Sequence, residues 1–143
     1  MIVAFCGNAT VRDAAEVEAW LLAVIPALIA EGADEFYVGG KGAFDALAAR
    51  AVQRCKARYP QVRVTLVQAY MDQPRIPELH DDLLYPSLEG VPRRFAMPRR
   101  NRYMVQAAAV LVSYVWDRTG NAQRICEYAH RLGKRVISYP QAI

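Results

Sequence analysis

Short apolar runs that end at glycine or polar residues alternate with amphipathic stretches along this chain. Five runs are typical of buried strands, and they cover residues 2–6, 35–38, 62–70, 109–115 and 135–138. The stretches between them repeat apolar residues at helical spacing. Strands that alternate with helices favour a parallel sheet with helices on both faces. The sequence therefore predicts an α/β fold, a three-layer, Rossmann-like arrangement with an open parallel sheet of about five strands.

The first amphipathic stretch carries start and stop signals of a helix. Asp13 and Glu16 have the spacing of a helix-start motif, in which side-chain oxygens bind the amides of the first turn. Gly32 is a good stop residue. Pro26 lies inside the apolar stripe, so we expect it to bend this helix without ending it.

Residues 71–98 contain five prolines and no periodic pattern. A connection this long is uncommon in a compact domain and is typical of lids and binding segments. A short helix is expected after it, at 99–107. The chain has 143 residues, the common size of one domain, and shows no internal repeat. We predict a single domain over residues 1–143.

Composition excludes several classes of protein. The longest apolar stretch, 19–30, is too short to cross a bilayer, and no secretory signal is visible. We expect a cytoplasmic protein without membrane contact. Cys6, Cys55 and Cys126 are far apart in sequence and are expected to be small buried residues. With two histidines, and with His80, Asp81 and Asp82 consecutive, no metal or other cofactor is predicted.

The positive charge is carried mostly by arginine, with five arginines between Arg93 and Arg102. Arginine suits bidentate contacts with phosphate. Because the net charge of +4 is modest and no aromatic–basic pattern stands out, nucleic acid is not the expected partner. The expected partner is a small nucleotide or a nucleotide derivative.

Ligands of open parallel sheets lie beyond the carboxyl ends of the strands. Three loops are expected there. The first contains Gly7 and Asn8, and the third contains Thr119, Gly120 and Asn121. The second contains Gly39, Gly40, Lys41 and Gly42, followed by Asp45.

The second loop is the sharpest of these signals, because glycines between a strand and a helix let amides approach an anion. Its spacing matches neither a dinucleotide fingerprint nor a P-loop. A phosphate cradle and a tight structural turn both remain open for it. Asp45 either contacts a ribose hydroxyl or caps the helix.

The segment Arg99-Arg100-Asn101 is expected to join these loops and to grip phosphate, base or sugar. Arg93, Arg94 and Arg102 are expected to form an ordinary solvated basic face instead.

Several motifs recur together in the order of a known family. They are Phe5-Cys6-Gly7-Asn8, Phe36-Tyr37-Val38-Gly39-Gly40 with Gly42-Ala43-Phe44-Asp45, Arg94-Phe95-Ala96 with Arg99-Arg100-Asn101-Arg102-Tyr103-Met104, and Glu127-Tyr128-Ala129 with Gly133-Lys134-Arg135-Val136-Ile137. Over nearly the whole chain the set resembles the YpsA-like branch of the SLOG superfamily, which is named for its DprA-like and LOG-like members. The resemblance implies a Rossmann-like fold that binds or senses nucleotides.

The resemblance also implies two alternatives and an assembly. LOG-like relatives are phosphoribohydrolases that cleave the N-glycosidic bond of nucleoside monophosphates. In that role Asp45 or Glu127 would be the acid or base, and Arg99 or Arg100 would hold the phosphate. Where those relatives carry Gly-Gly-x-Gly-Thr-x-x-Glu, this chain reads Thr119-Gly120-Asn121-Ala122-Gln123-Arg124. DprA-like relatives bind single-stranded DNA. Relatives often form homo-oligomers, and Trp20, Tyr114 and Trp116 are the residues expected to support a homodimer.

Overall fold

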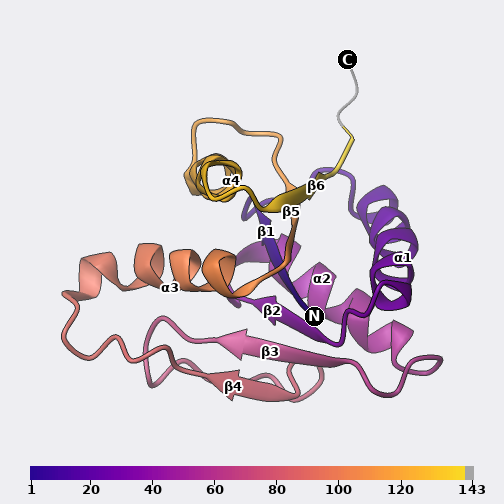
Figure 1. Cartoon of the computed structure of the whole chain (residues 1–143), viewed down its shortest axis with the longest axis horizontal. Helices are drawn as coiled ribbons and strands as arrows, with labels where there is room; N and C mark the ends of the chain where they lie inside the picture. The colour runs from indigo at the N-terminus through magenta and orange to yellow at the C-terminus, as the bar shows by residue number, and fades with distance from the viewer. Residues whose placement is uncertain (141–143) are drawn as a thin grey trace.

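A computed structural model describes residues 1–140 as a six-stranded sheet between two pairs of helices (Figure 1). The strands are β1 (Ile2–Gly7), β2 (Glu35–Val38), β3 (Arg63–Val67), β4 (Asp82–Leu84), β5 (Val110–Tyr114) and β6 (Arg135–Ser138). The helices are α1 (Ala14–Ala30), α2 (Gly42–Cys55), α3 (Arg93–Ala107) and α4 (Asn121–Arg131). The last three residues of the predicted domain, 141–143, lie outside the described residues.

The strand order is β4-β3-β2-β1-β5-β6, and every neighbouring pair is parallel. The chain moves outward from β1 to β4 and then returns to place β5 on the other side of β1. The order therefore reverses between β1 and β5, where an open parallel sheet leaves a crevice for ligands. The predicted three-layer α/β fold is confirmed.

Each face of the sheet buries its own core. Phe5, Phe36 and Phe44 lie at the centre of the core under α1 and α2, with Phe5 stacked on Phe36 at 5.9 Å between ring centroids. The core under α3 and α4 is smaller and contains Met104 and Leu111. Burial on both faces explains why the central strands are nearly continuous apolar runs.

The sheet has one strand more than expected, because β4 lies inside the segment taken for an irregular loop. This edge strand is only three residues long, too short to show a periodic pattern. Its place is fixed by partners distant in sequence: the amide of Asp81 donates to the carbonyl of Val64, and Arg63 makes two hydrogen bonds to Asp82.

One helix boundary and one expected helix cap also differ from the predictions. α3 begins at Arg93 and runs through Pro98, which forfeits one amide hydrogen bond near the start of the helix without stopping it. In α1, the side chain of Asp13 makes no capping hydrogen bond; its backbone carbonyl accepts from the amide of Val17 instead. The expected side-chain cap at Asp13 is therefore wrong. Pro26 lies inside α1, which continues to Ala30.

The tryptophans considered for a homodimer make contacts within the chain. Trp20 packs edge-on against Tyr139, with 5.3 Å between ring centroids. The indole nitrogen of Trp116 donates to the carbonyl of Thr10, and the guanidinium of Arg12 lies 4.0 Å from its ring centroid. The homodimer stays a prediction. Within residues 1–140, no helix combines the length and the apolarity needed to cross a membrane.

Candidate functional site

A cavity of about 290 Å³ opens at the carboxyl edge of the sheet, at the switch point between β1 and β5. We call it the edge cavity. Its walls come from the end of β1, the glycine loop before α2, the middle of α3 and the start of α4. Nine of the residues predicted from sequence line it: Gly7, Asn8, Gly39, Lys41, Asp45, Arg100, Asn101, Gly120 and Asn121.

Five other predicted residues do not line the edge cavity. Gly40 and Gly42 belong to the glycine loop but have positive φ angles of 72° and 85° and shape the turn. Arg99 is exposed on α3, and the structure gives its side chain no partner within residues 1–140. Thr119 binds the carboxylate of Asp117, at 2.6 Å from its hydroxyl. Glu127 lines a separate cavity between α3 and α4.

The amides of the glycine loop are bonded to a carboxylate of the chain itself. Oδ2 of Asp45 accepts from the amide of Gly39 at 3.1 Å and from the amide of Lys41 at 3.4 Å. Glycine turns of this kind make concave sites for anions. Here Asp45 is the anion, so at these two amides the loop is the tight structural turn that the sequence left open as an alternative.

Arg100 joins the glycine loop to the sheet. Its Nη1 donates to the carbonyl of Gly39 at 2.7 Å and to the carbonyl of Val67 at 3.0 Å. Only 2% of the residue is exposed. The segments 39–45 and 99–102 therefore meet on one side of the molecule. However, the guanidinium makes its bonds to the protein, and its Nε donates to Oδ1 of Asn101 at 2.8 Å.

Asp45 and Arg100 are buried ionisable groups, and burial is the main influence on the pKa of each. Burial raises the pKa of Asp45 to about 6, although the Arg100 guanidinium and the loop amides oppose the rise. Burial likewise lowers the pKa of Arg100, and the charge of Asp45 opposes that change. A carboxyl group with a pKa near 6 can exchange protons close to neutral pH.

Two glycines allow the loops to approach each other closely. A Cβ on Gly7 would lie 2.4 Å from the ring of Phe44, so α2 packs on β1 only because that position lacks a side chain. A Cβ on Gly42 would lie 2.6 Å from Cα of Ala9, and the amide of Ala43 donates to the carbonyl of Ala9 at 2.7 Å. The first and second loops are thereby held together.

Asn8 ties the first loop to the third. Its Oδ1 accepts from the amides of Trp116 and Asp117 at 2.8 and 3.1 Å, and its Nδ2 donates to the carbonyl of Asp117. The amide group of Asn8 is thus used within the protein. Its role in the structure is to hold the rim of the edge cavity in place.

The groups that remain available to a ligand belong to Lys41, Asn101 and the start of α4. Within residues 1–140 no partner is found for the Lys41 ammonium or for Nδ2 of Asn101. Helix α4 begins after Gly120, which has no side chain to cap the amides of the first turn. The uncapped amides and the helix dipole leave positive potential at the cavity wall.

The floor of the edge cavity was not predicted from sequence. It contains Met97, Met104 and Ile125, apolar side chains from α3 and α4. The sequence predicts Pro98 as the end of the irregular segment and so places Met97 outside the helix. The helical spacing of Met97 and Met104 is therefore missed. No other residue of 71–98 lines the edge cavity, so this segment is not a lid over it.

The floor also contains the thiol of Cys6, which lies 3.8 Å from the carbonyl oxygen of Ala122. Cys6 and Cys126, distant in sequence, both belong to the core under α3 and α4. The interaction of the two thiols lowers the pKa of Cys126 to about 7 and raises the pKa of Cys6. All three cysteines are free and buried.

The described residues contain no group of three metal-ligating side chains. The His80-Asp81-Asp82 run is engaged within the protein. Nδ1 of His80 accepts from the amide of Ile76, Asp81 pairs with Lys56, and Asp82 pairs with Arg63.

These features define a Rossmann-like α/β protein with a cavity at the switch point of its sheet. Several solved structures share the fold. Among them, TM1055, a structural genomics target, is 18% identical with a TM-score of 0.61, over 94% of this chain and 71% of that one. DNA processing protein A from Helicobacter pylori, described for its single-stranded DNA binding mode, is 15% identical with a TM-score of 0.72.

DNA processing protein A (DprA) from Streptococcus pneumoniae is 18% identical with a TM-score of 0.67. The chain is covered almost entirely in both comparisons, over 100% and 99%, but it spans only 66% of the Helicobacter protein and 50% of the Streptococcus protein. No protein-family model and no curated protein sequence matches the chain. The chain therefore shares a Rossmann-like fold with these three structures, and such a fold is what the resemblance implied.

Proposed function

We propose that the edge cavity binds a nucleotide or nucleotide-derived ligand. The phosphate lies at the start of α4, where the amides of the first turn have no side-chain cap, and Lys41 lines the same cavity. The observation that carries the proposal is this uncapped helix start at the switch point of the sheet. It differs from the expectation drawn from sequence, in which the amides of the glycine loop hold the phosphate, because Asp45 already binds those amides.

The rest of the cavity suits the nucleoside part of such a ligand. Met97, Met104 and Ile125 offer apolar contacts for a base, and the free Nδ2 of Asn101 offers a donor. A cavity of about 290 Å³ lies close to the lower end of the size range of small-molecule sites, roughly 300–1,000 Å³. A mononucleotide-sized group is therefore the appropriate occupant of the edge cavity.

Calorimetric titration with AMP, GMP, CMP and UMP tests the proposal. Asn121→Asp places a negative charge at the helix start, where it stabilises the helix but repels a phosphate. We expect at least a tenfold loss of affinity, about 1.4 kcal/mol. Gln61→Glu makes the same charge change at an exposed position outside the edge cavity and should leave affinity unchanged. No binding of any nucleotide by the wild type, or equal losses in the two variants, would refute the proposal.

A phosphoribohydrolase is the second candidate function, and Asp45 favours it. Its carboxyl group lines the edge cavity with a pKa of about 6, as a general acid or base requires. Cleavage of an N-glycosidic bond passes through a positively charged sugar that a nearby carboxylate stabilises. Glu127 and Arg99 lie outside the edge cavity, so the proposed chemistry depends on Asp45 alone.

Release of free base from nucleoside monophosphates distinguishes the two functions. An enzyme should release base, and Asp45→Asn should lower the rate at least a hundredfold, the usual contribution of a general acid or base. Glu127→Gln is the matched control and should keep the rate. If the nucleotide binds and stays intact over long incubation, the protein binds its ligand without cleaving it.

A further inference from the structure

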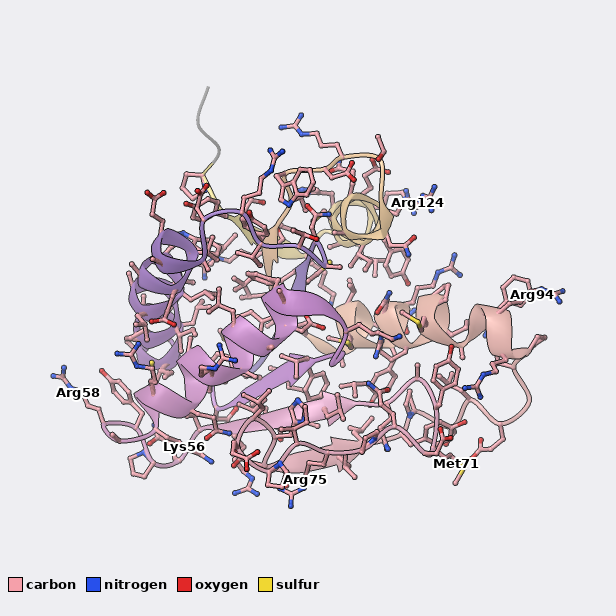
Figure 2. The ribbon with its side chains drawn as sticks, turned by 180° about the vertical axis from the view of Figure 1, so that it is seen from behind. Lys56, Arg58, Met71, Arg75, Arg94 and Arg124 are labelled. Atoms are coloured by element: carbon pink, nitrogen blue, oxygen red, sulfur yellow. The ribbon has the colours of Figure 1, made fainter. Side chains whose placement is uncertain are left out.

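The positive charge of this protein is concentrated on one face. Helices α3 and α4 carry seven arginines and a single acidic residue, Glu127, which gives them a net charge of +6. The whole chain has a net charge of +4, so the remainder carries −2. Figure 2 shows Arg94 and Arg124 on the side of the molecule formed by these helices, and Arg58 at the opposite end. The modest total charge conceals this asymmetry.

A second cavity, of about 350 Å³, lies between α3 and α4 within this basic face. We call it the side cavity. Three arginines line it: Arg102 from α3, and Arg124 and Arg131 from α4. Its acidic residue is Glu127, so the cavity wall has an excess of positive charge. Three guanidinium groups around one hollow are suited to a phosphate group.

The side chains of this wall are partly ordered by Tyr128. The guanidinium carbons of Arg102 and Arg131 lie 5.7 and 5.8 Å from its ring centroid, one from each helix. The Tyr128 hydroxyl accepts a hydrogen bond from Gln106 at 2.7 Å, which holds the ring. Cations near an aromatic ring are attracted by it, so both arginines are biased toward the cavity.

The two cavities adjoin. Met97, Asn101, Asn121 and Ile125 line both of them. Nη1 of Arg124, in the side cavity, donates to Oδ1 of Asn121 at 3.2 Å, at the helix start where the proposed phosphate lies. A ligand whose first phosphate occupies the edge cavity can therefore continue over Asn101 and Asn121 into the side cavity.

We propose that the side cavity holds a second phosphorylated unit of the same ligand, so that the preferred ligand is a dinucleotide with two phosphates. This inference rests on the proposed function of the edge cavity. Arg102, Arg124 and Arg131 bind the second phosphate. Arg93 and Arg94, at the start of α3, do not line the side cavity: Arg93 lies 4.1 Å from the ring centroid of Tyr70, and Arg94 lies 4.7 Å from that of Phe95.

The test compares three probes by calorimetric titration: the tightest-binding nucleoside monophosphate, its 5′-phosphorylated dinucleotide, and a 5′-phosphorylated 12-nucleotide strand of the same base. We expect the dinucleotide to bind at least tenfold more tightly than the monophosphate, and the 12-nucleotide strand to bind no more tightly than the dinucleotide. Arg102→Ala and Arg131→Ala should each remove most of the tenfold preference and leave monophosphate affinity unchanged.

Arg58→Ala is the matched control. Arg58 is also an exposed arginine near a tyrosine, 5.9 Å from the ring centroid of Tyr59, but it lies away from both cavities. The Arg58→Ala variant should keep the tenfold preference for the dinucleotide over the monophosphate. Equal affinities for monophosphate and dinucleotide would overturn the inference and leave the proposed function standing. A 12-nucleotide strand that binds tenfold more tightly than the dinucleotide would overturn it in favour of a nucleic-acid interface. No binding of any probe would refute the proposed function itself.

Discussion

The guanidinium of Arg100 donates a 2.7 Å hydrogen bond to the carbonyl of Gly39, 61 residues earlier in the chain. This bond joins the middle of α3 to the glycine loop, and a second bond to Val67 joins both to the end of β3. Because Arg100 also faces the buried carboxylate of Asp45, one side chain fixes the back wall of the edge cavity and offsets the charge inside it.

Arg100→Met should strongly destabilise the fold. It removes both hydrogen bonds to carbonyls, and a hydrogen bond from a charged donor is typically worth about 1.5–3 kcal/mol. It also removes the positive charge that opposes the effect of burial on the pKa of Asp45. Arg99→Ala is the neighbouring control: the side chain is exposed, and the free energy of unfolding should change by less than about 0.5 kcal/mol. Urea unfolding of both variants measures the difference. If both variants lost equally little stability, Arg100 would not be what holds the glycine loop to the sheet.

Asp45 should make the protein less stable as the pH rises from 4 to 7. Its pKa in the folded protein is about 6, above the ordinary 3.8, so the folded state holds the proton more tightly than the unfolded state. Its contribution to stability is therefore complete below pH 4 and is lost as the pH rises through 6. The loss is on the order of 3 kcal/mol.

Asp45→Asn removes this titration. We expect the stability of the variant relative to wild type to increase between pH 4 and pH 7.5 by that amount, measured by urea unfolding at each pH. A difference between variant and wild type that stays constant with pH would mean that the carboxyl group titrates normally in the folded protein.

Gly7→Ala should destabilise the contact between β1 and α2. The new methyl group would lie 2.4 Å from the Phe44 ring, and overpacking of this kind costs about 1–3 kcal/mol. Adding Phe44→Leu should not restore the loss, because leucine keeps atoms at the Cβ and Cγ positions, which lie 2.8 and 2.5 Å from the new methyl group. Gly90→Ala, where the methyl group meets nothing within 4 Å, should cost little. Thermal unfolding compares the four proteins, and a harmless Gly7→Ala would disprove the close contact.

The fold was predictable from sequence because its signals are local. The apolar runs of β1 and β5 and the stripes of α1 and α2 each lie within one stretch of chain. β4 was not predicted, because three residues are too few to show a periodic pattern. Its position also depends on contacts with Val64 and Arg63, which lie far from it in sequence. The start of α3 was predicted too late in the chain, because Pro98, a signal of irregular structure, lies inside the helix.

The candidate site was predictable as a location and less so in its contacts. Strand ends and glycines identified the loops that line the edge cavity, since parallel strands all end at one edge. The role of Asp45 was not visible, because the same residue and spacing serve a helix cap, a ribose contact or an internal partner for loop amides. The apolar floor and the basic side cavity depend on how α3 packs against α4, which no local pattern specifies.

The position of the phosphate is the central claim, and a nuclear magnetic resonance titration of backbone amides with the tightest-binding nucleoside monophosphate tests it most directly. The account predicts the largest shifts at residues 121–123, in the uncapped first turn of α4, with smaller shifts around Lys41. Largest shifts at β4 or along α1, with residues 121–123 unchanged, would contradict it.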